Sequence, residues 1–133
     1  YQGFNPSDYQ RQLTRRVRGL PLWFSLAMHG TDRYEKAISR GIELAQIAGR
    51  MIEEAEHTEL VREPNLSCVL YRRKGWSPED YRDWTFRNHK AGFALVAPTK
   101  WRNPEGVETV SRFCFINPDT TEKDIADILD SMR

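Results

Sequence analysis

The sequence predicts an α+β fold, in which a small antiparallel four-stranded sheet carries helices on one face. Two observations lead to this prediction. Apolar residues follow a helical period in the first part of the chain, and strand-like segments with two further helices follow after residue 57. Turn and capping residues also divide the chain into the order helix, long helix, strand, strand, helix, strand, strand, helix.

The composition is that of an ordinary folded domain. Of the 133 residues, 39% are hydrophobic and 29% are charged, and 20 Lys and Arg residues nearly balance 19 Asp and Glu residues. This balance argues against a nucleic acid or an acidic membrane as a partner of the whole chain. The longest apolar run, Leu20 to Met28, is about half as long as a helix that spans a bilayer. We therefore expect no nucleic-acid partner and no membrane partner.

The first two predicted helices indicate that the chain is a piece of a longer protein. Leu20 to Met28 form a helix that ends at Gly30 and is apolar on nearly every side, so it must be buried all round or lie in an interface. A second helix opens at Thr31 and runs to about Ala55, where roughly 24 residues would span about 36 Å. That length exceeds the expected size of so small a domain, whose radius of gyration is about 14 Å. Such a helix can join two domains.

Four short segments are predicted to form the sheet. The first two, at 60–61 and 68–71, are separated by a Pro-Asn turn and predict a hairpin. The third covers 93–97, and the fourth covers 107–116 after an Asn-Pro-Glu-Gly turn. Along the fourth segment two sets of side chains alternate: Val110, Arg112 and Cys114 on one side, and Ser111, Phe113 and Phe115 on the other.

The two remaining helices have clear start signals. Ser77 is the predicted cap of the first, and Asp80 completes a capping box. Trp76 and Tyr81 are placed to form a hydrophobic staple across this start. Thr121 is the predicted cap of the last helix. The predicted inner-face residues of the two helices are Tyr81, Trp84, Ala91, Ile125, Ile128, Leu129 and Met132.

Cys68 and Cys114 each lie in an apolar segment that predicts a strand. We expect two buried, reduced core thiols, because no Cys-x-x-Cys motif or Cys/His cluster favours a disulfide or a metal site. Reduced thiols favour a cytoplasmic location. The histidines, His29, His57 and His89, are far apart in the sequence and are expected in surface or structural roles.

Arg112 lies in the middle of the fourth predicted strand. A central strand rarely holds a charge unless that charge is paired or reaches a ligand. A planar guanidinium in this position is suited to hold a carboxylate through two parallel hydrogen bonds. An exposed strand face, or a structural pair with an acidic residue, explains the same residue, and the alternatives stay open at this point.

Several short motifs resemble those of a known family. Leu13 to Trp23 is similar to the Arg-Arg-x-x-x-Leu-x-x-Trp region of the group II pyridoxal-phosphate-dependent amino-acid decarboxylases. These enzymes include the aromatic-amino-acid, glutamate and 2,4-diaminobutyrate decarboxylases. Ser111 to Pro118 resembles their last strand and the Asn-Pro that leads into the final helix. Gly30-Thr31 and Ala97-Pro98-Thr99 fit the pattern in between, so the resemblance covers essentially the whole chain.

The resemblance implies the C-terminal part of a fold-type I enzyme, divided into three regions. Residues 1–30 would be the tail of the large domain that binds pyridoxal phosphate, 31–56 the long interdomain helix, and 57–133 the small C-terminal α+β domain. The complete enzyme would be a homodimer whose large domain holds the cofactor. This piece would close the active site, add substrate and dimer contacts, and be inactive alone.

The resemblance also suggests roles for two residues. Arg112 matches a family arginine that can contact the substrate carboxylate, and Thr14 matches a position near the substrate side chain. Asn88-His89-Lys90 resembles the Asn-x-His-Lys run that carries the cofactor lysine, but it closes a predicted helix. The cofactor lysine should instead follow a strand and be desolvated. We therefore expect Lys90 to be a solvated helix-end lysine, and no catalytic, cofactor-binding or metal-binding residue in the chain.

A second interpretation is a module without catalytic activity. Layers of strands and helices of this size also serve in ligand sensing or protein interaction. A strand followed by an Asn/Asp-x-His-Lys motif upstream of residue 1 would favour the enzyme. Neither interpretation tells which amino acid is the substrate.

Overall fold

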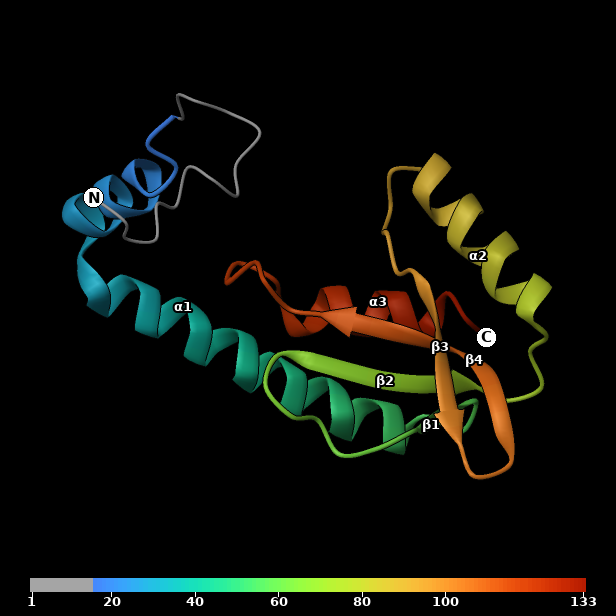
Figure 1. Ribbon diagram of the computed structural model, residues 1–133. Helices are drawn as coiled ribbons and strands as arrows, with labels where there is room; N and C mark the ends of the chain where they lie inside the picture. Colours follow the sequence, from blue (N-terminus) through green and yellow to red (C-terminus); the bar gives the residue numbers. More distant parts are fainter. Residues whose placement is uncertain (1–15) are drawn as a thin grey trace. The chain divides into compact units, whose positions relative to one another are not determined.

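The structure is a computed structural model that describes residues 16–133. These residues form an α+β fold, as predicted (Figure 1). None of the helices in this part of the chain is long and apolar enough to cross a membrane. The elements, in order, are α1 (Leu20–Glu54), β1 (Thr58–Leu60), β2 (Cys68–Arg73), α2 (Pro78–Lys90), β3 (Pro98–Asn103), β4 (Gly106–Cys114) and α3 (Glu122–Asp130).

The chain divides into two compact units, Tyr1–Tyr34 and Glu35–Arg133. The boundary falls inside α1, shortly after a break at Gly30, whose backbone has φ 72° and ψ 165°. Glycine has no Cβ, so it adopts a positive φ at little steric cost. The predicted end of the first helix at Gly30 is therefore confirmed. The assignment of 1–30, 31–56 and 57–133 to parts of a larger enzyme stays a prediction.

The four strands form one antiparallel sheet in the order β1-β2-β4-β3. β1 and β2 pair as the predicted hairpin, with Leu60 opposite Tyr71, although β1 covers 58–60 instead of the expected 60–61. β4 lies between β2 and β3, and Leu70 of β2 pairs with Arg112 of β4. The predicted Asn-Pro-Glu-Gly turn connects β3 to β4. β3 is an edge strand, because β4 is its only neighbour among the described strands.

The third strand begins later than predicted. The segment 93–97 contains no strand, and β3 starts only at the proline that follows it. Val96 is buried in the core, and its carbonyl oxygen accepts a hydrogen bond from Thr85 Oγ1 of α2 at 2.9 Å. Val96 is thus fixed against α2 instead of pairing with a strand. A proline is acceptable at the start of β3 because an edge strand does not need every backbone N–H in the ladder.

α2 begins as predicted. The Ser77 hydroxyl accepts a hydrogen bond from Asp80 N at 3.3 Å, and the Asp80 carboxylate accepts one from Ser77 N at 2.7 Å. The rings of Trp76 and Tyr81 meet edge to face with centroids 5.2 Å apart, which completes the hydrophobic staple. Ala91 was expected on the inner face, but it is the exposed cap residue after α2 ends.

α3 also begins as predicted, because Thr121 caps it through a reciprocal pair of hydrogen bonds with Asp124.

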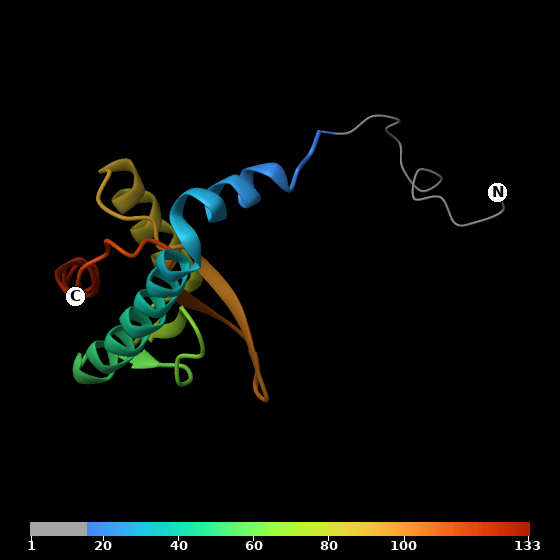
Figure 2. The same ribbon diagram turned by 90° about the vertical axis from the view of Figure 1, so that its left-hand side faces the viewer.

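One hydrophobic cluster joins the three described helices to one face of the sheet. Figure 2 shows the helices of the second unit on the same side of β3 and β4, so the predicted arrangement is confirmed. The cluster contains Leu44, Ala45, Ala48 and Ile52 of α1, Val69, Tyr71, Phe113 and Phe115 from the sheet region, Tyr81 and Trp84 of α2, Ile125 and Leu129 of α3, and the nearby Val96 and Met132.

Candidate functional site

The face of the sheet opposite this cluster, hereafter the outer face, holds the candidate site. Directly paired residues in antiparallel strands point to the same side, and neighbours along a strand alternate. In β4, Phe113 is buried in the core, whereas Arg112 and Cys114 are exposed. Val110 is also buried, so the alternation in exposure begins only after it. By this pairing the outer face carries Glu59, Cys68, Leu70, Arg72, Trp101, Glu108, Arg112 and Cys114.

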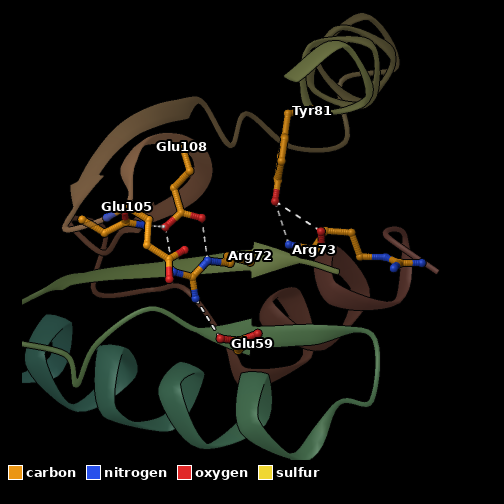
Figure 3. A network of polar contacts seen from close by, with 7 residues as sticks. Glu59, Arg72, Arg73, Tyr81, Glu105 and Glu108 are labelled. Atoms are coloured by element: carbon orange, nitrogen blue, oxygen red, sulfur yellow. Dashed lines mark hydrogen bonds and ion pairs between the residues drawn. The ribbon is translucent and has the colours of Figure 1, made fainter. Parts of the chain in front are cut away.

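At one end of the outer face, two carboxylates hold Arg72 (Figure 3). Arg72 Nε and Nη2 donate to the two carboxylate oxygens of Glu108, both at 2.7 Å, and Nη1 donates to Glu59 at 2.8 Å. Asn103 Nδ2 donates a further hydrogen bond to Glu108 at 2.8 Å. The side chains of Arg72 and Glu108 are 28% and 27% exposed, so the pair is partly shielded from water. Such a two-pronged pair is the strong form of an arginine–carboxylate contact.

The same contacts fix the charges at this end. The hydrogen bonds from Arg72 hold the pKa of Glu108 below its usual value. The hydrogen bond to Glu108 in turn raises the pKa of the Arg72 guanidinium. Because the donors of Arg72 are already directed at carboxylates, this end of the outer face is structural.

Arg112 lies on the same face, opposite Leu70, but in different surroundings. It is exposed, and it forms no ion pair with any residue in 16–133. The structural acidic partner considered from the sequence is therefore not found in the described part of the chain. The guanidinium remains available there to a ligand. Thr14, the other candidate residue, lies outside the described residues, so its place relative to Arg112 stays a prediction.

Cys68 and Cys114 share the outer face with Arg112. Both lie in strands as predicted, but both are exposed, so the prediction of buried core thiols is wrong. The strand alternation explains this, because Val69 and Phe113 take the inward positions beside them. The two Sγ atoms are 3.6 Å apart. Partial burial and the neighbouring Cys68 raise the pKa of the Cys114 thiol, while the charge of Arg112 acts in the opposite direction.

The described residues do not fit a pyridoxal phosphate site. A lysine that forms a Schiff base must be desolvated enough to lose its proton. Lys90 is the exposed last residue of α2, which confirms that it is a solvated helix-end lysine. The lysines in 16–133 are all exposed: Lys36, Lys74, Lys90, Lys100 and Lys123. No reaction step through the cofactor therefore follows from these residues.

Comparison with known proteins identifies the family. The family model described as the pyridoxal-dependent decarboxylase conserved domain matches residues 4–74. The chain therefore belongs to the pyridoxal-dependent decarboxylase family. An aromatic-L-amino-acid decarboxylase of Bacillus atrophaeus is 27% identical over 128 residues, which cover 89% of this chain and 25% of that protein. The aromatic-L-amino-acid decarboxylase of Manduca sexta is 36% identical over 101 residues, which cover 74% of this chain and 20% of that protein.

Solved structures show the same fold. The crystal structure of mouse CSAD in apo form matches with a TM-score of 0.75 and 23% identity, over 95% of this chain and 29% of that chain. At this identity the likeness concerns the fold alone. The chain spans a quarter or less of the length of the curated relatives it matches, with 25% and 20% of the two proteins above.

Proposed function

We propose that this chain is the C-terminal part of a pyridoxal-phosphate-dependent L-amino-acid decarboxylase, in which Arg112 binds the carboxylate of the substrate. The reaction is the release of the α-carboxyl group of an amino acid as CO2. The cofactor is held by a part of the enzyme outside this chain, because the described lysines do not fit it. The chain alone is therefore inactive.

One observation supports the role of Arg112: an exposed cation on a strand without a carboxylate partner in 16–133. Arg72 on the same face does not suit this role, because its hydrogen-bond donors are already directed at Glu59 and Glu108. A guanidinium can donate two parallel hydrogen bonds to a carboxylate, and so fix both its position and its plane. Thr14 is the second proposed substrate contact, near the substrate side chain.

Exposed apolar surface supports the proposal that this chain packs against other parts of a larger enzyme. In the first unit, side chains at the start of α1 are between 52% and 64% exposed: Leu20, Leu22, Trp23, Phe24 and Met28. In the second unit, Ile116 is 89% exposed and borders an apolar hollow of about 300 Å³. Large exposed apolar patches usually mark interfaces, and these side chains are candidates for one. We assign these surfaces to the large domain and to the second subunit of a cytoplasmic homodimer.

The test of the substrate role is Arg112→Lys in the complete enzyme. This change keeps the charge but loses the planar pair of donors, so kcat/KM should fall roughly 10- to 150-fold. Thermal unfolding should stay nearly unchanged, because Arg112 has no described ion pair to lose. An unchanged kcat/KM would refute the substrate contact, whatever happens to stability.

The matched control is Arg72→Lys on the same face. It should lower the melting temperature and leave kcat/KM per folded molecule nearly intact, because Arg72 stabilises the sheet through its hydrogen bonds to Glu108.

A separate test concerns the cofactor. The 133-residue chain incubated with pyridoxal phosphate should show no absorbance band of a bound cofactor. A band that disappears in Lys90→Ala would contradict the assignment of the cofactor site to another part of the enzyme.

A further inference from the structure

The two thiols occupy directly opposed positions in the two central strands, at the end of their ladder where β2 begins with Cys68 and β4 ends with Cys114. Beside them, Phe115 N donates a backbone hydrogen bond to Ser67 O at 2.9 Å. Hydrogen-bonded and non-hydrogen-bonded pairs alternate along an antiparallel ladder, so the cysteines form a non-hydrogen-bonded pair. In such pairs the Cα atoms are about 4.5 Å apart and the side chains lie closest together.

This geometry is compatible with a disulfide bond. Disulfides in proteins join Cα atoms that are about 4.4–6.8 Å apart, a range that includes this kind of pair. The Sγ atoms are 3.6 Å apart, and rotation of the two side chains can bring them to the bond length of about 2.05 Å. Both side chains are exposed, so a reagent in solution can reach them.

We propose that Cys68 and Cys114 form a dithiol site that low-molecular-weight disulfides, such as glutathione disulfide, oxidise to a disulfide linking β2 to β4. One cysteine thiolate attacks the small disulfide, forms a mixed disulfide and releases one small thiol. The second cysteine then attacks the protein sulfur of that mixed disulfide, forms the cross-strand bond and releases a second small thiol. The protein loses two electrons and two protons, and one disulfide molecule is reduced to two thiols.

A metal site explains the pair less well. Two thiolates supply half of the ligands of a closed tetrahedral zinc site. In residues 16–133 no group of three or more His, Cys, Asp or Glu side chains is placed to hold a metal ion. Oxidation to a disulfide needs only the two sulfur atoms from the protein, with the small disulfide as the oxidant.

The test is thiol–disulfide equilibration of the 133-residue chain in buffers of reduced and oxidised glutathione. Remaining thiols are trapped with an alkylating reagent, and intact and peptide masses are read by mass spectrometry. We expect both cysteines to escape alkylation together, with a linked pair of peptides. The equilibrium constant should be more than about tenfold higher in the folded chain than in guanidinium chloride, because the fold holds the thiols together.

The matched control moves one thiol along the same strand. In Cys68→Ser/Leu70→Cys the two cysteines would be diagonal neighbours with Cα atoms about 7–8 Å apart, beyond the usual reach of a disulfide, so the gain over the unfolded chain should be lost. Near-ultraviolet circular dichroism checks that each variant is folded. Equal constants in folded and unfolded chain, or separate glutathione adducts on Cys68 and Cys114, would overturn the proposal. The readout is the state of the sulfur atoms, so it is independent of decarboxylase activity.

Discussion

Arg72 and Arg112 lie on the same face of the same sheet, yet the two ends of the outer face differ in what surrounds the charge. At the Arg72 end, Glu59 and Glu108 direct their carboxylates at the guanidinium. At the Arg112 end, the described residues supply an exposed cation beside two exposed thiols and no carboxylate partner. The difference teaches that a charge inside a strand is not in itself a functional signal. Its partners decide whether it holds the sheet together or is available to a ligand.

The largest effect should come from oxidising the thiols at the Arg112 end. A bond between positions 46 residues apart restricts the unfolded chain, and should stabilise the folded state by about 2–4 kcal/mol. Denaturant unfolding of the oxidised and reduced chain measures the difference. Cys114→Ser should show no response to oxidation in the same assay. A destabilised oxidised form would mean that the bond distorts the ladder.

Removing each guanidinium in turn tests directly whether Arg72 and Arg112 differ in what they contribute to stability. Arg72→Met should destabilise the fold by about 1–2 kcal/mol, because it leaves the partly buried Glu108 carboxylate without its charged partner. Arg112→Met should change the free energy of unfolding by less than about 0.5 kcal/mol, as for other surface substitutions. Urea unfolding of both variants measures this. Equal losses would show that Arg112 has a structural partner.

Acid should weaken the contact between Arg72 and Glu108, whereas Arg112 has no described carboxylate partner that acid could protonate. The pKa of Glu108 is lower in the folded chain than its usual value, so the folded state favours the carboxylate. This contribution is fully present above the unfolded pKa, about 4.3, and is lost as the pH falls through the lower folded pKa. Glu108→Gln should therefore show a smaller loss of stability between about pH 5 and pH 3 than the unchanged chain. If thermal melts showed the same loss of stability with falling pH in Glu108→Gln and in the unchanged chain, this prediction would be contradicted.

The smallest effect should be on the reactivity of Cys114. Arg112 partly offsets the burial that raises the pKa of this thiol. Arg112→Gln should raise that pKa further, and slow alkylation of Cys114 near pH 8 by a factor of about 1.5–5. The rate is best measured in the Cys68→Ser background, where one thiol remains. Arg72→Gln in the same background should leave the rate unchanged, and a faster reaction in Arg112→Gln would be the opposite of what we expect.

Local signals made much of the fold predictable from the sequence. The helix break at Gly30 and the caps at Ser77 and Thr121 depend on residues within a few positions of each other, and the structure confirms them. The strand expected at 93–97 was wrong because strand pairing depends on a distant partner, and Val96 of this segment bonds to α2 instead.

The candidate site was less predictable, because it depends on side-chain direction and on distant contacts. Both cysteines were placed in strands, yet their exposure follows from which face of the sheet the core covers. The pair of Arg72 and Glu108 was missed, since the two residues are 36 positions apart. The signal in the sequence was weak: Glu108 lies within the fourth predicted strand, and Arg72 directly follows the second. Arg112 was singled out from its place in a strand and from the family resemblance, and its role stays a prediction.

The polar character of β3 has a consequence for solubility. An edge strand offers a row of backbone groups to which a strand of another molecule can add, and this is a route to aggregation. Lys100 and Arg102 put positive charge along β3, and Pro98 removes one backbone donor at its start. Two chains approaching through this edge would bring like charges together, while the proline would interrupt the new ladder. The residues that make β3 hard to recognise as a strand thus protect the sheet from growing into a fibril.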